Sequence, residues 1–223
     1  MNSIIIPVLN EEKILQENKE YYLRLKTRAG LIFVDGGSTD RTSQIAKNYG
    51  EMIVSPRGRA RQMNAGAKIC RGENIFFLHA DTLVTDEALL QMEDVFKKGM
   101  LGGCFSMKIK EEGFIFRVFE CLVNFRARHF QVIDGDLGMF VKKEVFDRLG
   151  GFDQVTAMED ILFSKKLRKA VKVVALPGKI FVSARRWREE GFWKTFFKYS
   201  QVYIRLWCGN IKGRKSDDVK INK

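Results

Sequence analysis

The chain has 223 residues, of which 45% are hydrophobic and 30% charged, so it can bury the core of one domain, or of one domain with an appendage. Its net charge of +12 favours anionic partners, namely nucleotides, nucleic acid or an acidic membrane surface, although a basic, well-solvated surface explains the charge too. Two histidines are too few for a histidine-built zinc site, and no run of 18 apolar residues is present to span a bilayer.

The four cysteines lie too far apart for a metal knuckle or a CxxC redox pair. No secretory leader precedes the first apolar run. We therefore expect reduced thiols in a cytoplasmic protein.

The first half of the chain alternates between strand-like and helix-like segments. Apolar runs predict strands, and helical spacing predicts helices between them: strands over 3–8, 31–34, 52–54 and 74–78, and helices over 11–25, 40–48, 60–71 and 86–97. Strands that alternate with helices imply a parallel sheet with right-handed crossovers.

From about residue 102 the pattern is less regular. We expect a turn at 134–136, strands over 103–109, 138–141, 171–176 and 179–183, and helices over 112–128, 143–149 and 160–170. The segment 192–208 carries aromatic residues at helical spacing, with charged residues off that face. It suits a helix lying in a membrane interface, and packing on the domain or a dimer contact is the alternative.

Polar side chains follow two of the predicted strands at the point where each strand ends. Asn10 and Glu11 come after the first strand, and Asp35 comes after the second. In an open parallel sheet, ligands bind outside the carboxyl ends of the strands, so these groups converge on one site. They suit a nucleotide, with Asp35 accepting from ribose hydroxyls or a base N–H. Helix capping and a tight turn are the structural alternatives.

Three arginines, Arg57, Arg59 and Arg61, fall within five residues just before and within the predicted helix 60–71. Guanidinium groups match phosphate oxygens in geometry, and the small residues around them indicate close packing. We interpret the loop as a clamp for a diphosphate. The alternative is a solvated basic loop.

Two further acidic positions indicate catalysis. Asp81 follows the most apolar strand, where a carboxylate can hold Mg²⁺ or Mn²⁺ on phosphate oxygens; capping of the loop around Thr82 is the alternative. Glu159 and Asp160 open a helix, and one of them could act as a general base, because an unperturbed carboxylate is ionised at neutral pH. Favourable placement of acids at a helix N-terminus explains this pair equally well.

Taken in order, these motifs resemble those of family-two glycosyltransferases, which have the GT-A fold. More closely, they are similar to a small bacterial subgroup known as selenium- or radical-SAM-associated, or arsenosugar-type, glycosyltransferases. The match covers residues 3–210 and is carried by Gly58-Arg59-Ala60-Arg61-Gln62-Met63-Asn64-Ala65-Gly66-Ala67, Leu78-His79-Ala80-Asp81-Thr82, Met158-Glu159-Asp160 and Ser183-Ala184-Arg185-Arg186-Trp187.

The resemblance implies an α/β fold of GT-A type, with a mostly parallel sheet flanked by helices. One domain would cover residues 1–210. Its first half, 1–101, would bind the nucleotide-sugar, and its second half, 102–210, would hold the acceptor and the catalytic base. A polar tail, 211–223, would follow.

The resemblance also implies a role for each matching residue. Asp160, with Glu159 beside it, matches the catalytic base, and Asp81 matches the last acid of the metal-binding Asp-x-Asp. The nucleotide-sugar would contact Pro7, Asn10, Glu11, Asp35, Arg57, Arg59, Arg61, Asn64 and His79. The acceptor or the diphosphate would contact Asp136, Arg185, Arg186 and Trp187.

Four positions depart from the family pattern. Gly36 stands where relatives often have a second acid that helps to recognise the base. His79 replaces the first acid of Asp-x-Asp, so Asp81 and the diphosphate would hold the metal between them. Ser183 stands where processive enzymes carry glutamine, which argues against a processive polymerase. Leu137 stands where the subgroup is expected to have glutamine.

Together these features predict an inverting glycosyltransferase that moves a sugar from a UDP- or GDP-sugar to an acceptor hydroxyl, with Mn²⁺ or Mg²⁺ as cofactor. The expected partners are that donor, an acceptor that could be lipid-linked, an anionic membrane surface and a second copy of the chain, but not nucleic acid. The expected location is cytoplasmic, with peripheral attachment to the inner face of the cell membrane as an extension.

Two other functions stay open. A nucleotidyltransferase acting on a sugar phosphate would normally need a glycine-rich loop where Pro7-Val8-Leu9-Asn10 stands. A basic RNA- or membrane-binding module without catalysis has no need of Asp35, Asp81 and Asp160 at element boundaries.

Overall fold

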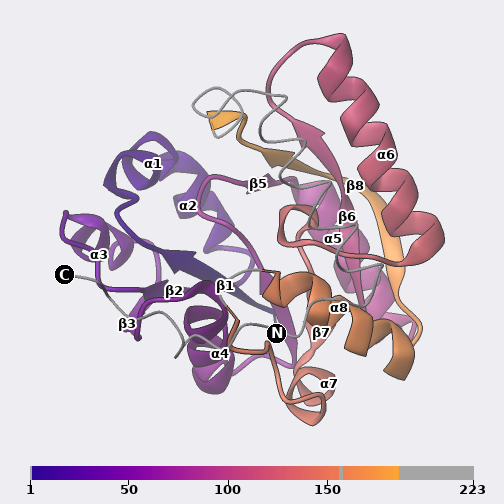
Figure 1. The fold of residues 1–223 in the computed structure, drawn as a ribbon. Helices are drawn as coiled ribbons and strands as arrows, with labels where there is room; N and C mark the ends of the chain where they lie inside the picture. The colour runs from indigo at the N-terminus through magenta and orange to yellow at the C-terminus, as the bar shows by residue number, and fades with distance from the viewer. Residues whose placement is uncertain (1, 156–157, 186–223) are drawn as a thin grey trace, which may run out of the picture.

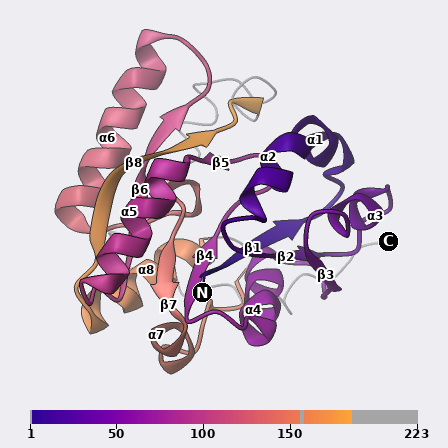
Figure 2. The same cartoon turned by 180° about the vertical axis from the view of Figure 1, so that it is seen from behind.

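The computed structural model describes residues 2–155 and 158–185. In this part of the chain eight strands form one sheet in the order β3-β2-β1-β4-β7-β6-β8-β5, with helices on both faces (Figures 1 and 2). The predicted α/β fold, with a mostly parallel sheet flanked by helices, is therefore confirmed.

The sheet divides at β4 into a parallel and a mixed part. Its strands are β1 (Asn2–Val8), β2 (Gly30–Asp35), β3 (Glu51–Val54), β4 (Asn74–Phe77), β5 (Leu83–Val84), β6 (Gly102–Ile109), β7 (Phe140–Lys142) and β8 (Val174–Val182). β1 to β4 run parallel, whereas β7 is antiparallel to both β4 and β6. The carboxyl ends of β1, β2 and β4 therefore share one edge, where the polar motifs were expected to converge.

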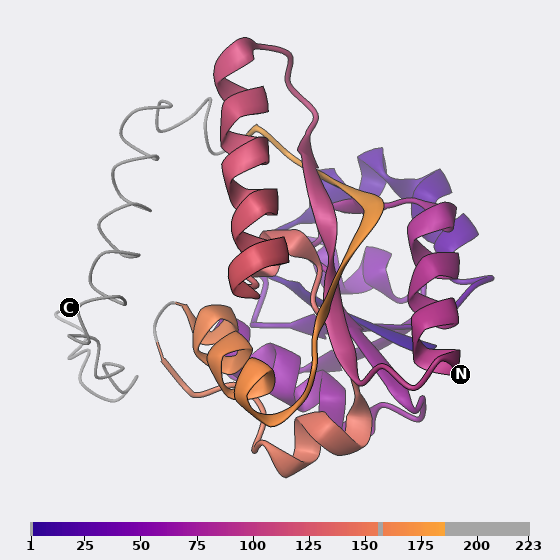
Figure 3. The same ribbon diagram turned by 90° about the vertical axis from the view of Figure 1, so that its right-hand side faces the viewer.

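Helices cover this sheet on both sides. They are α1 (Glu12–Glu17), α2 (Lys19–Leu25), α3 (Thr42–Ala46), α4 (Arg59–Ile69), α5 (Asp86–Lys97), α6 (Phe114–Phe130), α7 (Lys143–Arg148) and α8 (Glu159–Ala170), with a 3₁₀ turn, η1, at Gly135–Leu137. Figure 3 shows α5 and α6 on opposite sides of β6 and β8.

Close packing of α4 fixes the edge that carries the site. A Cβ on Gly66, in the middle of α4, would lie 2.6 Å from Ile5 Cγ2 on β1 and 3.0 Å from Val34 Cγ2 on β2. Only glycine lets the helix approach both strands so closely. The approach brings the first turn of α4, with its arginines, next to the ends of β1 and β2.

The predicted elements are present, with three differences. The helix expected over 11–25 is two helices, because Asn18 ends α1 and its side-chain amide donates to the Ile14 carbonyl. The two strands expected over 171–176 and 179–183 are the single strand β8, which passes through Pro177-Gly178 at a register shift against β6. The two-residue strand β5 was not predicted. The segments 192–208 and 211–223 lie outside the described residues.

Candidate functional site

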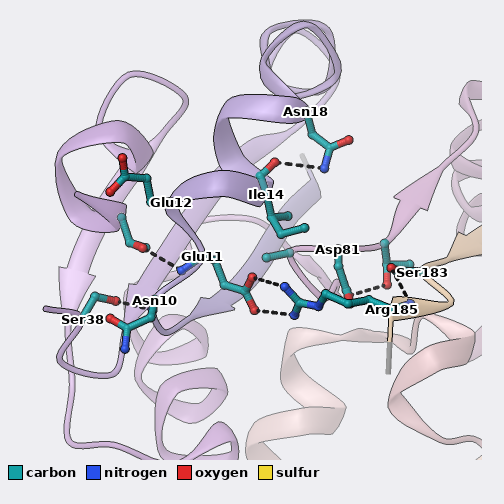
Figure 4. A network of polar contacts seen from close by, with 12 residues as sticks. Asn10, Glu11, Glu12, Ile14, Asn18, Ser38, Asp81, Ser183 and Arg185 are labelled. Atoms are coloured by element: carbon teal, nitrogen blue, oxygen red, sulfur yellow. Dashed lines mark hydrogen bonds and ion pairs between the residues drawn. The ribbon is translucent and has the colours of Figure 1, made fainter. Parts of the chain in front are cut away.

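The turns that follow β1 and β2 are joined by hydrogen bonds. The Asn10 amide donates to Ser38 Oγ (2.9 Å), and the Thr39 amide donates to Asn10 Oδ1 (2.9 Å). The Glu11 amide donates to Thr42 Oγ1 (2.8 Å) at the start of α3. These bonds hold the two strand ends together, and they leave the Glu11 carboxylate directed away from α3 (Figure 4).

A buried glutamine, Gln62 on α4, also connects the ends of β1 and β2. Its Nε2 donates to the carbonyl oxygens of Val8 and Val34, at 2.8 Å each. A Cβ on Gly36 would lie 3.0 Å from the Gln62 carboxamide, so a side chain at that position would require the carboxamide to shift by a few tenths of an ångström. The glycine that departs from the family pattern therefore leaves the Gln62 hydrogen bonds undisturbed. Sequence analysis did not single out Gln62, although it lies within the Gly58–Ala67 motif.

We predict that Gln62→Leu lowers the free energy of unfolding by about 1–3 kcal/mol, because the carbonyl groups of Val8 and Val34 each lose the hydrogen bond from the Gln62 amide while side-chain volume is nearly kept. Urea unfolding measures the loss. Gln16→Leu is the matched control, since Gln16 is exposed on α1 and its amide donates to the side chain of Glu12 (3.4 Å). Equal effects of the two substitutions would contradict the bridging role.

Asp35 is buried at the end of β2, and both of its carboxylate oxygens have donors. Oδ1 accepts from the amides of Gly37 (3.1 Å) and Ser38 (2.9 Å) and from the Ser38 hydroxyl (2.7 Å). Oδ2 accepts from the Ser43 hydroxyl. In the described structure Asp35 thus organises the turn, and its contact with a nucleotide stays a prediction.

The three arginines of the expected clamp do not face the same way. Arg57 is exposed, and Arg61 Nε donates to Gln154 Oε1 (3.4 Å) at the surface. Arg59 instead turns towards α8, where its Nε donates to Glu159 Oε1 in an ion pair with that buried carboxylate. Arg59 therefore belongs to the acid cluster, and contact of Arg57 and Arg61 with a diphosphate stays a prediction.

Asn64 was predicted to contact the donor. Both the nitrogen and the oxygen of its side-chain amide bond to the backbone of Phe152. Its Nδ2 donates to the Phe152 carbonyl (2.8 Å), and its Oδ1 accepts from the Phe152 amide (2.9 Å). These bonds tie α4 to the loop before α8. A donor contact of Asn64 stays a prediction.

Asp160 lines a small pocket together with Pro7, Arg59, Met63, Phe77, Leu78, His79, Gly135, Met139, Phe152 and Glu159. Its Oδ2 accepts from the Gly135 amide (2.6 Å), and its Oδ1 accepts from the Ile161 amide (2.7 Å). Burial raises the pKa of Asp160 to about 6, against the opposing charge of Arg59. At neutral pH this carboxylate is mostly ionised and can accept a proton.

We predict a pH-dependent effect of Asp160→Asn on stability. The folded-state pKa of Asp160 lies above its ordinary value of 3.8, so the native state binds the proton more tightly than the unfolded chain does. The contribution of Asp160 to the free energy of unfolding therefore falls as the pH rises from about 4 to above 6. Asparagine cannot ionise, so the stability of the variant relative to wild type should increase by about 1 kcal/mol from pH 5 to pH 7.5. Urea unfolding at both values tests this, and a constant difference would contradict it.

The segment 134–136 meets His79 at Gly135. A Cβ on Gly135 would lie 2.5 Å from His79 Nε2 and 2.9 Å from Asp160 Oδ2. A side chain there would separate the two groups, so glycine allows His79 and the candidate base to share one pocket. Asp136, the next residue, acts electrostatically on Arg59.

A second group of charges lies at the ends of β1 and β4. The Arg185 guanidinium donates to both Glu11 oxygens, at 3.4 Å each, and its backbone amide donates to Ser183 Oγ (3.2 Å). Asp81 lies beside this pair (Figure 4). Burial raises the pKa of Glu11 against the influence of Arg185, and the charge of Asp81 raises it further, which places the two carboxylates close together.

The carboxylates of Glu11 and Asp81 are the candidate ligands of the predicted metal ion. No group of three or more metal-ligating side chains occurs within residues 2–155 and 158–185. Mg²⁺ and Mn²⁺ bound with a nucleotide need only one or two carboxylates, because phosphate oxygens and water fill the other positions. Asp81, with Glu11 beside it, fits that requirement. Arg186 and Trp187 lie outside the described residues.

Nine of the predicted residues thus gather at one edge of the sheet in two groups. Glu11, Asp81 and Arg185 form the first, and Arg59, His79, Asp136, Glu159 and Asp160 form the second, with Pro7 lining the same pocket. A model of the family described as "Glycosyl transferase family 2" matches residues 3–140. The chain belongs to glycosyl transferase family 2.

Two curated proteins are similar in sequence. The poly-beta-1,6-N-acetyl-D-glucosamine synthase of Staphylococcus epidermidis is 27% identical over 96% of this chain and 58% of its own length. The uncharacterized glycosyltransferase YkcC of Bacillus subtilis is 30% identical over 44% of this chain and 34% of its own length. The chain therefore spans less than two thirds of the curated proteins it matches.

Solved structures show the same fold. TarS residues 1–349 of S. aureus, in complex with UDP-GlcNAc, superposes with a TM-score of 0.63 at 20% identity, over 82% of this chain and 58% of TarS 1–349. The mannosyltransferase PcManGT of Pyrobaculum calidifontis, in complex with GDP-Man and Mn²⁺, gives a TM-score of 0.62 at 18% identity, over 90% of this chain and 64% of that one.

Proposed function

We propose that this family member is an inverting glycosyltransferase that uses a UDP- or GDP-sugar and Asp160 as its base. The observation that supports this most is the buried carboxylate of Asp160, held by two backbone amides in a pocket at the carboxyl ends of β1 and β4. Asp160 takes the proton of an acceptor hydroxyl while that oxygen attacks the anomeric carbon. The bond to the diphosphate breaks on the opposite face, and the nucleoside diphosphate leaves.

The other residues of the site position the donor and stabilise the charge that develops on the leaving group. Arg57 and Arg61 face the surface beside the ends of β1 and β2 and suit the diphosphate. Asp81, with Glu11 beside it, would hold the divalent cation, which when bound neutralises charge on the phosphate oxygens. Asn10, in the turn after β1, bonds to the turn after β2, and both turns would contact the nucleoside.

The experiment that tests this proposal is a titration with UDP- and GDP-sugars, each with and without Mn²⁺, followed by product analysis. Release of nucleoside diphosphate with an acceptor supports sugar transfer. Release of pyrophosphate from a nucleoside triphosphate and a sugar phosphate would identify a nucleotidyltransferase instead. Absence of binding to all of these ligands would leave a non-catalytic module. Mass spectrometry of nucleotide-sugars retained from a cell lysate would then identify the donor.

We further infer a non-processive enzyme of the small arsenosugar-type subgroup. This inference rests on the motifs over Gly58–Ala67 and Leu78–Thr82 and on Ser183, which stands where processive enzymes carry glutamine. Products that carry one added sugar support it, and polymer formation would contradict it.

The outer face of α6 favours a membrane surface as a further partner. Phe114, Leu122 and Phe125 are 84%, 56% and 51% exposed, whereas the inner face of α6 is hydrogen-bonded to β6, for example from Asn124 to the Met107 backbone. The only carboxylate of α6, Glu120, is buried. No helix in the described residues is long and apolar enough to cross a bilayer.

Cations lie near the carboxyl end of α6. Arg128 is exposed, although its guanidinium donates to Ser106 Oγ of β6 (3.1 Å), and Arg168 of α8 donates to the Phe130 carbonyl (2.6 Å). An apolar helix face bordered by cations is typical of peripheral binding to anionic lipid, and we propose that this face binds such a surface. A lipid-linked acceptor would then approach the protein from the side of α6, which packs on β6.

We predict that the protein floats with anionic vesicles at low salt and dissociates at high salt. Leu122→Gln/Phe125→Gln should weaken binding at least about tenfold, because apolar area no longer leaves water. Leu90→Gln is the matched control, since Leu90 is 55% exposed on α5, on the other side of the sheet. Absence of flotation together with a concentration-dependent dimer that the double substitution disrupts would assign the face to a second copy of the chain.

A further inference from the structure

We propose that Arg59 supports the base through its charge and its pairing with Glu159, that it keeps Asp160 ionised, and that it is not a ligand of the donor diphosphate. The inference deepens the proposed function and rests on it. The role proposed for Arg59 differs from that of Arg57 and Arg61, although the three arginines form one motif in the sequence.

The first observation is the direction of the Arg59 side chain. It leaves the first turn of α4 and forms an ion pair with Glu159, which lies 100 residues further along the chain at the start of α8. The Glu159 side chain is 2% exposed, whereas that of Arg59 is 39% exposed. A buried carboxylate without its cation is strongly destabilising, so Glu159 requires Arg59 at this position. An arginine held in this way is poorly placed to reorient towards a phosphate.

The second observation is the charge around Asp160. Glu159 adjoins it on α8, Asp134 precedes the 3₁₀ turn, and Asp136 within that turn acts on Arg59. His79 reaches the same pocket from the loop after β4, across Gly135. Among the charged groups that act most strongly on Asp160 in the described residues, Arg59 is the cation, and Glu159 and Asp134 are anions.

The consequence concerns protonation at neutral pH. Burial and the neighbouring anions favour the protonated form of Asp160, and Arg59 opposes them. Without the guanidinium charge, Asp160 would hold its proton at neutral pH and could not accept one from the acceptor. Although burial opposes it, the surrounding carboxylates of Glu159, Asp160 and Asp136 raise the pKa of Arg59, so its own charge is secure.

The test is an NMR titration of Asp160 in the donor-free protein with ¹³C-labelled aspartate, the signal being assigned with Asp160→Asn. Arg59→Met should raise the pKa of Asp160 by about 1–3 units, the usual effect of an adjacent arginine. Arg61→Met, from the same helix, is the matched control and should leave it unchanged. In transfer assays the acid limb of kcat/KM should move by the same amount in Arg59→Met, whereas Arg61→Met should mainly weaken donor binding.

A double variant keeps the test decisive if Arg59→Met alone fails to fold. Arg59→Met/Glu159→Gln removes both members of the buried pair, so no charge is left without a partner. The pKa of Asp160 in the double variant should lie above that in Glu159→Gln alone. Equal pKa values in these two variants would overturn the proposal. The titration needs neither donor nor acceptor, so its outcome is independent of whether Asp160→Asn abolishes transfer, which tests the proposed function.

Discussion

Asp160→Asn is expected to lower the rate of sugar transfer at least about 100-fold, which is the usual contribution of a general base, with little change in donor affinity. Asparagine can still accept one of the two amide hydrogen bonds that Asp160 accepts, from Gly135 or from Ile161, but it cannot take a proton from the acceptor. Single-turnover rates and donor binding, measured on the same preparation, separate the two effects. Asp153→Asn is the matched control, because Asp153 pairs with Lys166 (2.6 Å) and does not line the pocket.

The ionisation of Asp160 should also appear in the pH dependence of the transfer rate of the wild-type protein. With a pKa of about 6, Asp160 becomes protonated as the pH falls, so transfer at pH 5 should be about tenfold slower than at pH 7.5. Asp160→Asn should lose this acid limb. Turnover near the wild-type rate in the variant would move the role of base to Glu159 or Asp136.

Asp81→Asn is expected to abolish the Mn²⁺ dependence of donor binding while the fold is kept. The side chain lies after β4 beside Glu11 and Arg185, and only Thr82 Oγ1 donates to it among the described contacts, at 3.4 Å. The fold therefore depends little on its charge, whereas a divalent cation requires a carboxylate oxygen. Calorimetric titration of the donor with and without Mn²⁺ gives the difference directly.

Asp86→Asn provides the comparison for Asp81→Asn. Asp86 is an aspartate five residues further on, in the first turn of α5, and its nearest ion-pair partner is Arg24 at 3.9 Å. Asp86→Asn should leave the Mn²⁺ dependence of donor binding unchanged. Mn²⁺-dependent donor affinity that is unchanged in Asp81→Asn would exclude Asp81 as the metal ligand and direct attention to Glu11.

The sequence by itself determined the elements and the edge at which the site forms. Helix α5, Asp86–Lys97, begins and ends where the pattern predicts, because its cap at Thr85 and its apolar spacing are local properties. The acids that follow apolar runs, such as Asp35 and Asp81, were placed correctly at strand ends because parallel strands must end on the same edge. Both signals lie within short segments and need no knowledge of distant contacts.

Only the tertiary structure decided which polar groups bond to one another. Arg57, Arg59 and Arg61 are alike in sequence, yet Arg59 alone turns inwards, because Glu159 meets it from α8. Gln62 and Asn64 bond to backbone groups 54 and 88 residues away, so their structural roles are invisible in the motif that contains them. The direction of β7 and the passage of β8 through Pro177-Gly178 likewise depend on neighbouring strands. A short segment specifies its own conformation through burial and capping, whereas the partner of a buried charge or amide is set by which distant element packs against it.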